Sequence, residues 1–199
     1  MKRLTVQITG KTPLLMNRVP AEALEKLRIK EKGTKFKPAE DPRQDAKTKV
    51  YATEDGKPYI PTENLLSCLV AGGQFVRLDG KRQMSTTKST IVTALITLED
   101  PYLPLVDPET GKPAQWEVDM RQGRNPNGGE MVCVVRPRFD RWRINASVLV
   151  DDESVGMQKI RETFEKALNW CGLGDYRPSK KGNFGKGMIT LWKEEKLPA

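Results

Sequence analysis

The sequence predicts an α+β fold built around one antiparallel sheet, because strand-like and helix-like segments follow one another along the chain. Arg3–Thr9 alternates apolar and polar residues, and Trp142–Val150 does so more regularly. This two-residue period is typical of a strand with one buried face and one solvent face. Ile91–Leu98, which is rich in β-branched residues, and Met188–Trp192 are predicted as two further strands.

Two helices are predicted between these strands. The first begins after Pro61 with Thr62 as its N-cap, and the second runs from Asp151 to Cys171 with Gly172 just beyond its end. The order strand, helix, strand, strand, helix, strand is that of a ferredoxin-like (RRM-like) βαββαβ core. In such a core both helices cover one face of the sheet, which leaves the other face for insertions or ligands.

Two insertions interrupt the core of this predicted single domain, residues 1–199. The first, at about 20–58, contains a helix at Ala21–Lys32 and a polar stretch at Gly33–Lys49 that we expect to be mobile. The second, at about 101–130, is rich in Pro, Gly and Asn and precedes the extended stretch Met131–Phe139. This composition indicates a protruding, thumb-like hairpin or lobe.

The composition excludes several kinds of chemistry. The chain of 199 residues has no histidine, which removes Ser-His-Asp and Cys-His catalysis and histidine metal sites. Cys68, Cys133 and Cys171 stand far apart in apolar contexts, so we predict three core thiols, no metal site and no cofactor. Without a run of 18 apolar residues or a signal-peptide core, we expect a cytoplasmic protein without membrane contact.

The net charge of +8 favours a polyanionic partner wherever the cations are clustered. The most basic flexible segment is the glycine loop, Gly172–Gly187, with five glycines, four cations and two aromatic residues. Glycines let the backbone approach a phosphate, cations supply counter-charge, and aromatic rings stack on bases. The candidate binding residues here are Gly174, Tyr176, Arg177, Lys180, Lys181, Phe184 and Lys186. The alternative is a solvated surface loop with glycines in its turns.

A second basic segment runs from Arg77 to Lys88. Its candidate phosphate contacts are Arg77, Lys81, Arg82 and Lys88. Met84 lies between them and is predicted to be a flexible apolar tip that wedges between bases. A disordered basic connection is an equally good interpretation.

Arginines also mark the predicted lobe and the strands that follow it. Arg121 and Arg124 are candidates for contacts to a nucleic-acid backbone or to a neighbouring subunit, together with Asn125 and Asn127 at the lobe tip. Around the turn at Phe139-Asp140 the candidates are Arg136, Arg138, Arg141 and Arg143. Only Asp140 lies close in sequence to neutralise these four, so binding is favoured over a salt-bridged surface.

Three stretches together resemble the RAMP superfamily of CRISPR-associated proteins: "LTVQITGKTPLLM", "YIPTENLLSCLVAGG" and "GLGDYRPSKKGNFGKGMI". In that family a first strand runs into a Thr-Pro turn, an Ile-Pro-x-x-x-Leu stretch opens the first helix, and a glycine-rich loop precedes the last strand. The chain is also similar in texture to short RAMP-like proteins of phages and mobile elements. It departs from the family where a Cys-Leu-Val-Ala run replaces a commonly basic position of the first helix, which puts RNA contacts from that helix in doubt.

The resemblance implies a nucleic-acid-binding subunit, most similar to the repeated backbone subunit that coats guide RNA in CRISPR effector complexes. Its partners would be guide RNA, copies of itself in a helical filament and other effector-complex subunits. It also implies a thumb hairpin between the second and third strands, where the 101–130 insertion falls.

Three alternatives stay open. One is a mobile-element protein that coats single-stranded DNA, and another is an assembly module whose charge is incidental. The third is a carboxylate- and metal-dependent ribonuclease acting through Asp79 or Asp119, although nothing distinguishes either from an ordinary loop aspartate. We therefore expect a non-catalytic protein.

Overall fold

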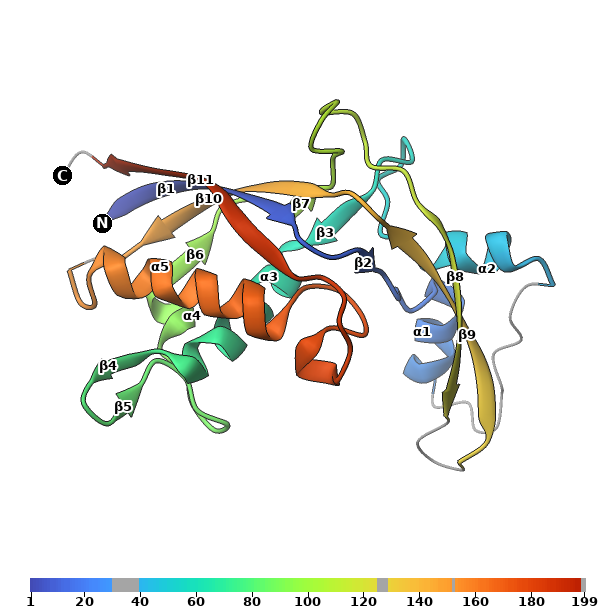
Figure 1. Cartoon of the computed structure of the whole chain (residues 1–199), viewed down its shortest axis with the longest axis horizontal. Coiled ribbons are helices and arrows are strands. Elements are labelled where there is room, and N and C mark those ends of the chain that lie inside the picture. Colours follow the sequence, from blue (N-terminus) through green and yellow to red (C-terminus); the bar gives the residue numbers. More distant parts are fainter. Residues whose placement is uncertain (30–39, 125–128, 152, 198–199) are drawn as a thin grey trace.

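The computed structural model describes residues 1–29, 40–124, 129–151 and 153–197 (Figure 1). Its main sheet has four antiparallel strands in the spatial order β11-β1-β10-β6. Their bounds are Lys2–Gly10 for β1, Ile96–Leu98 for β6, Arg143–Val150 for β10 and Gly187–Lys196 for β11. Numbered along the chain this is the order 4-1-3-2 of a ferredoxin-like sheet, so the predicted fold class is confirmed.

Two helices cover one face of this sheet: α3, Thr62–Gly72, and α5, Met157–Lys166 (Figure 1). Alternate residues of β1 point toward them, and Leu4, Val6 and Ile8 are fully buried there. Across the register Leu4 lies opposite Val148, which is equally buried. Each such side chain contributes about 1.5–3 kcal/mol on leaving water, so the alternating pattern determines which face becomes the core.

Two expected element starts are wrong. Thr62 is the first helical residue rather than the N-cap, and its hydroxyl donates to the carbonyl of Asp100. Helix α5 begins at Met157, because Asp151 instead accepts hydrogen bonds from the Glu153 amide at 3.2 Å and the Ser154 hydroxyl at 2.8 Å, which forms a turn. Asp151 therefore satisfies groups of its own turn, and α5 starts only after that turn. The Thr62 hydroxyl instead contacts a carbonyl that is distant in sequence.

The second predicted strand is also shorter than expected. Val92–Leu95 forms the short helix α4, and only Ile96–Leu98 pairs with β10. At the far end of α5, the π-helix η2 at Ala167–Cys171 extends the helix, and Gly172 follows with φ 73°, as predicted for a residue just past a helix end.

The first insertion contains α1 at Ala21–Arg28 and α2 at Pro42–Thr48, and the short strands β2 at Leu14–Leu15 and β3 at Tyr59–Pro61 flank it. The stretch Gly33–Lys49, expected to be mobile, lies partly outside the described residues, and its described part is mostly helix α2. Asp41 caps α2 by accepting the Arg43 amide at 2.9 Å. The Asp-Pro pair therefore marks the start of a helix in a stretch whose polar composition alone favours a loop.

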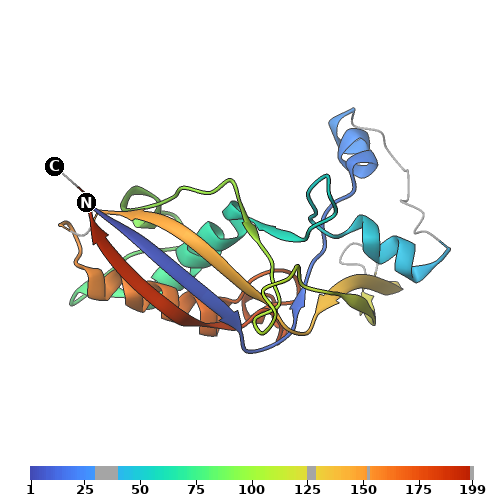
Figure 2. The same ribbon diagram turned by 90° about the horizontal axis from the view of Figure 1, so that it is seen from above.

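The second insertion contains β7 at Tyr102–Pro104 and β8 at Glu117–Arg124, and β9 at Met131–Phe139 follows it. Strands β8 and β9 pair antiparallel from Glu117↔Arg138 to Arg124↔Met131, which confirms the predicted hairpin, although its tip residues 125–128 lie outside the described part. Figure 2 shows the hairpin extending beyond the sheet at the end of the molecule where α1 and α2 lie. Lys49 ties α2 to it by donating to the Val135 carbonyl at 2.8 Å.

A smaller hairpin lies on the helical side of the sheet. It consists of β4, Arg77–Asp79, and β5, Arg82–Gln83, and follows the short 3-10 helix η1 at Gly73–Phe75. Another 3-10 helix, η3, occupies Pro178–Lys180 inside the glycine loop.

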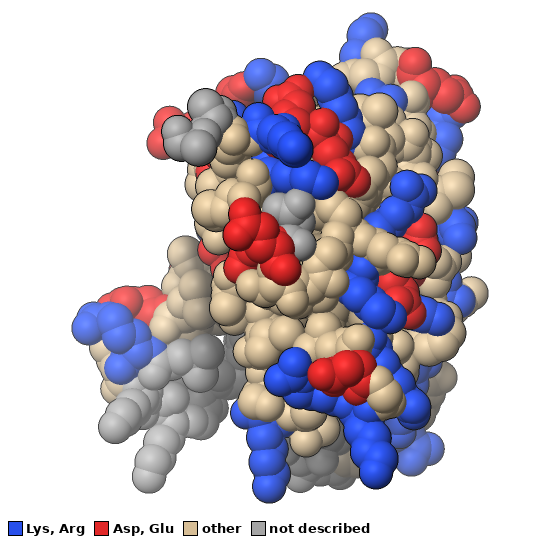
Figure 3. Space-filling view, turned by 90° about the vertical axis from the view of Figure 1, so that its left-hand side faces the viewer, with Lys and Arg blue, Asp and Glu red and all other residues tan. Residues whose placement is uncertain are grey.

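Both ends of the chain lie at one end of the molecule, which Figure 3 views directly. Cations and carboxylates are interspersed over this face, and several are paired. Arg3 pairs with Glu99 at 2.8 Å and Lys193 with Glu195 at 2.7 Å. Among the described residues, no helix has the length and apolar character needed to cross a bilayer.

Candidate nucleic-acid interface

The glycine loop is held against the turn that follows β1. The Gly185 amide donates to the Pro13 carbonyl at 2.8 Å, and the Lys186 amide donates to the Thr12 hydroxyl at 3.0 Å. Farther along, the Asp175 amide donates to the Leu15 carbonyl at 2.8 Å. Two of the three motifs that resemble the RAMP superfamily, the Thr-Pro turn and the glycine loop, are therefore packed together although they lie at opposite ends of the chain.

The glycines serve the packing of the loop itself. A Cβ at Gly182 would lie 1.7 Å from the Tyr176 carbonyl oxygen, and one at Gly185 would lie 1.9 Å from that of Leu173. At Gly174, where φ is 72°, a Cβ would lie 2.3 Å from the Leu15 carbonyl oxygen. No side chain fits at these positions, which accounts for the glycines by close backbone contact.

The expected backbone cradle for phosphate is wrong for most of the loop. Amide groups that already donate to protein acceptors belong to Leu173, Asp175, Lys180, Lys181, Gly182, Phe184, Gly185 and Lys186. These groups are not available to a ligand without breaking the loop. What the loop offers to solvent is its side chains.

Two arginines of the β8–β9 hairpin enclose the two aromatic rings of the glycine loop. The guanidinium carbon of Arg121 lies 4.7 Å from the centre of the Phe184 ring, and that of Arg136 lies 5.9 Å from the Tyr176 ring. The two rings stack on each other with centroids 6.0 Å apart and an angle of 30°. Arg121, Phe184, Tyr176 and Arg136 thus form one stack, here named the aromatic ladder, which joins loop and hairpin.

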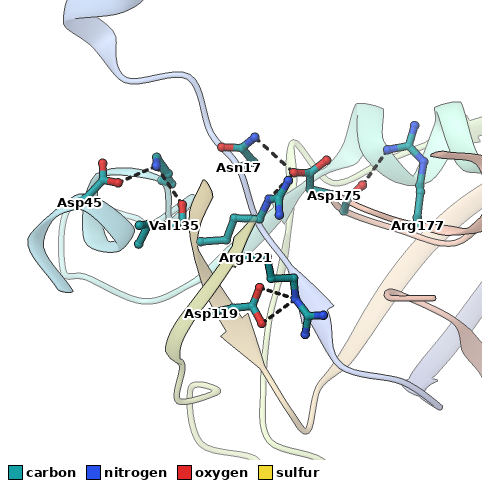
Figure 4. A network of polar contacts seen from close by, with 10 residues as sticks. Asn17, Asp45, Asp119, Arg121, Val135, Asp175 and Arg177 are labelled. Atoms are coloured by element: carbon teal, nitrogen blue, oxygen red, sulfur yellow. Dashed lines mark hydrogen bonds and ion pairs between the residues drawn. The ribbon is translucent and has the colours of Figure 1, made fainter. Parts of the chain in front are cut away.

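Buried or half-buried carboxylates hold both arginines in place (Figure 4). The Nε of Arg121 donates to Asp119 at 2.8 Å, and the Asp119 side chain is only 4% exposed. This hydrogen bond raises the pKa of Arg121. The Asp175 carboxylate accepts from Arg136 Nε at 2.6 Å and from the side-chain Nδ2 of Asn17 at 3.2 Å. The ladder is therefore preorganised before any ligand arrives.

The expectation that the arginines near the Phe139-Asp140 turn are left unneutralised is wrong. Arg136 pairs with Asp175, Arg138 with Asp140 and Glu117, and Arg141 with Asp107 and Glu109. Most of these partners are distant in sequence, so no local pattern points to them. Arg143 is half-buried and donates to the Pro108 carbonyl at 3.1 Å.

The glycine loop carries several cations without a carboxylate partner, as do other described surfaces, for example at Lys81 and Lys112. In the part of the chain that the structure describes, Lys180, Lys181 and Lys186 have no carboxylate within ion-pair distance, and Arg177 contacts only the Gly174 carbonyl at 2.6 Å and the Ser179 hydroxyl at 3.0 Å. Next to them lies an open groove of about 460 Å³, lined in part by Arg121, Arg138, Asn183 and Phe184. Its walls combine cations, an amide and an aromatic face, which can bind a phosphate and a base, with the carboxylate of Asp140, which pairs with Arg138.

No family model matches the sequence. No match was found among curated proteins either. Among solved structures the chain is similar to the crystal structure of Cmr6 from Pyrococcus furiosus, with 10% sequence identity and a TM-score of 0.46, over 95% of this chain and 99% of that one. The fold assignment rests on the strand order of the main sheet.

The second basic segment has a different structure from the one expected. Met84 is not an exposed wedge but a core residue, 1% exposed, whose sulfur accepts the Thr163 hydroxyl at 3.0 Å. The β4–β5 hairpin carries the exposed Arg77, Lys81 and Arg82 around it, and Arg82 lies 3.6 Å from Asp79. Lys88 is exposed in the following loop, so the cations of this segment reach solvent while its methionine anchors it.

Some candidate residues are brought together and others are not. Tyr176 and Phe184 of the glycine loop come together with Arg121, Arg136 and Arg138. Gly174 and Arg177 line a different pocket beside Asn17 and Asp175. Arg124 lies toward the hairpin tip, and Arg77–Lys88 lies on the helical side of the sheet. Sequence reasoning missed Asn17, Asp119 and Asp175 as partners that position arginines, because no local pattern reveals these pairings. It also missed two exposed aromatic residues, Phe75 and Trp170.

Proposed function

We propose that this protein binds single-stranded nucleic acid without base specificity, through the glycine loop and the base of the β8–β9 hairpin. The observation that carries the proposal is the aromatic ladder standing beside Lys180, Lys181 and Lys186, which lack carboxylate partners among the described residues. Phosphates would follow the lysines and Arg177, while bases would stack on the outer face of the Arg121 guanidinium, which ends the aromatic ladder and whose side chain is 43% exposed. Every base has a π-face, so such contacts do not discriminate between sequences.

A single strand fits this site better than a duplex. Tyr176 is 40% exposed and lies in the loop rather than on a helix or strand that could enter a groove. Only unpaired bases can be splayed out to stack on the guanidinium plane that ends the ladder. The arginines of the ladder are already fixed by carboxylates, so little side-chain entropy is lost when the strand binds.

We further propose that the strand is guide RNA and that several copies of the chain coat it in a helical ribonucleoprotein with other effector-complex subunits. The support is the three motifs that resemble the RAMP superfamily, together with the ferredoxin-like order of the sheet. The role is non-catalytic and needs no cofactor. Binding of single-stranded DNA is the second outcome that the experiments distinguish.

The salt dependence of binding tests the site. Removing one phosphate contact should reduce the slope of log affinity against log salt by about 0.7, so Lys180→Gln/Lys181→Gln/Lys186→Gln should reduce it by about 2. A matched control, Lys26→Gln/Lys112→Gln/Lys196→Gln, removes the same charge from other surfaces and should leave the slope near that of the wild type. Equal slopes for the two triple variants would contradict the proposal.

The nature of the strand is tested on protein purified from cells. Nucleic acid that co-purifies is extracted and digested separately with RNase and DNase. RNA of discrete length supports the guide-coating role. DNA would support the single-stranded DNA alternative, and protein that carries no nucleic acid and ignores added strands would overturn both.

A further inference from the structure

An exposed aromatic pair lies outside the site described above. Phe75 in η1 and Trp170 in η2 are 47% and 50% exposed, and their ring centroids are 4.9 Å apart at an angle of 79°. The ammonium of Lys166 lies 4.1 Å from the centre of the Trp170 ring. Aromatic rings this large are highly buried on average, so two half-exposed rings in contact, one of them with a cation over its face, are an informative surface feature.

The hydrophobic core does not account for the presence of a tryptophan at position 170. Along α5 and η2 the buried stripe consists of Ile160, Phe164, Leu168 and Cys171, and Trp170 points away from it. Of the other tryptophans Trp142 is fully buried, and Trp116 and Trp192 pack against the core. Trp170 is thus the tryptophan that contributes least to the core and most to the surface.

The aromatic pair lies between the two basic segments, with a cation on each side. Asn169 accepts the ammonium of Lys11 at 2.8 Å, and the Lys11 amide donates to the Lys186 carbonyl in the glycine loop at 2.8 Å. On the other side, Phe75 lies two residues before the exposed Arg77, where the β4–β5 hairpin begins. Figure 1 shows the glycine loop and this hairpin on the same side of the sheet.

The nearest carboxylates on α5 are already neutralised. Glu162 pairs with Lys159 at 3.0 Å, and Glu165 pairs with Arg161 at 3.2 Å. These pairs are neutral, so Lys166 over the Trp170 ring and Lys11 at Asn169 add positive charge beside the aromatic pair, which suits a strand of phosphates.

We propose that Phe75 and Trp170 form a stacking platform for bases of the bound single strand, which continues from the glycine loop across the helical face toward the β4–β5 hairpin. This inference rests on the proposed function and extends it to a second contact site. It explains why two segments far apart in sequence, Arg77–Lys88 and Gly172–Gly187, are both basic. It also assigns a role to two residues that the core does not need.

A second copy of the chain fits the platform less well. With about half of the roughly 150–250 Å² of each ring exposed, the pair offers on the order of 200 Å² of apolar surface. A stable protein interface needs about 800 Å² from each partner. Two rings suffice for one or two bases, because stacking one base is itself a strong interaction.

The test compares Trp170→Ala and Trp170→Phe in binding to fluorescently labelled single-stranded RNA and DNA, scored by anisotropy. Loss of the ring should weaken binding roughly 5- to 100-fold, and phenylalanine should restore most of the affinity because it keeps a π-face. An abasic strand should bind the wild type and Trp170→Ala equally. Strand binding should also quench tryptophan fluorescence in the wild type but much less in Trp170→Phe.

A matched control exists in the chain. Tyr59 and Tyr102 also have ring centroids 4.9 Å apart, and Tyr102 is 41% exposed, but Glu54 and Asp55 line the pocket beside them. Tyr102→Ala should therefore change affinity by less than about twofold. Phe75→Ala provides a second test should Trp170→Ala unfold, and thermal unfolding checks both.

The outcomes separate the two proposals. Wild-type binding that Trp170→Ala and Phe75→Ala leave unchanged would overturn the platform and keep the proposed function. No binding by the wild type would overturn both. Altered sedimentation of Trp170→Ala without altered strand binding would assign the rings to an interface between copies and overturn the platform.

Discussion

The guanidinium of Arg121 lies over the ring of Phe184, 4.7 Å from its centre, and this contact joins the hairpin to the glycine loop. Arg121 comes from the insertion between the second and third strands of the sheet, whereas Phe184 precedes the fourth. The pairing therefore couples two segments that the ferredoxin-like core alone would leave independent. A nucleic-acid strand that contacts either segment meets a surface made by both.

A double-mutant cycle of Arg121→Gln and Phe184→Leu should reveal this coupling. The Arg121 side chain is 43% exposed, so we expect an interaction energy of about 0.5–1 kcal/mol in the free energy of unfolding. Denaturant titration of the four proteins measures it. Additive effects of the two substitutions would show that the contact does not hold the hairpin.

The glycine loop should tolerate no side chain at Gly185. Gly185 and Gly111 have nearly the same backbone angle, φ 69° and 68°, but only Gly185 has a backbone oxygen where a Cβ would lie. Gly111→Ala should cost about 1–2 kcal/mol from the left-handed backbone alone. Gly185→Ala should cost at least about 2 kcal/mol more, because the chain must also move.

Thermal unfolding of the two variants makes the comparison. For a chain of this length 1 kcal/mol corresponds to about 2–4 °C in Tm, so the melting temperatures should differ by at least about 4 °C. Similar melting temperatures would mean that the loop has room to adjust.

The parts of the fold that depend on local periodicity could be predicted from the sequence. The alternation in Trp142–Val150 identifies its buried face correctly, because one face of a strand must leave water. The prediction of one strand over Ile91–Leu98 is half wrong. Only Ile96–Leu98 pairs with β10, and Val92–Leu95, which has no strand to pair with in the described part of the chain, forms a short helix. Local propensity does not specify how many residues of a neighbouring strand are available for pairing.

The candidate site is predicted less well, for a similar reason. Cations can be found by inspecting the sequence, but their ion-pair partners cannot when they are distant in sequence, as Asp175 is from Arg136. The basic neighbours of Met84 favour an exposed tip, whereas the fold turns this side chain inward. Trp170 does have a signal in the sequence, because it falls outside the apolar stripe of its helix.

The cysteines should differ sharply in reactivity. Cys133 is exposed on β9, which corrects the expectation of three core thiols, whereas Cys68 and Cys171 are buried. Burial raises the pKa of both buried thiols, so they stay protonated and unreactive at about pH 8. A disulfide exchange reagent should titrate one thiol quickly and the other two only on unfolding, and two fast thiols would contradict the burial of the core pair.

Asp119 should position Arg121 rather than cleave RNA. Its carboxylate is nearly buried and both of its oxygens accept from Arg121, which leaves it poorly placed to activate a water. In Asp119→Asn the arginine must be ordered when the strand binds, so affinity should fall about 2- to 10-fold. Asp79→Asn is the control, because Asp79 is exposed and its ion pair with Arg82 is long, at 3.6 Å. RNA incubated with magnesium should stay intact with all three proteins, and cleavage by the wild type that Asp119→Asn abolishes would make this residue catalytic.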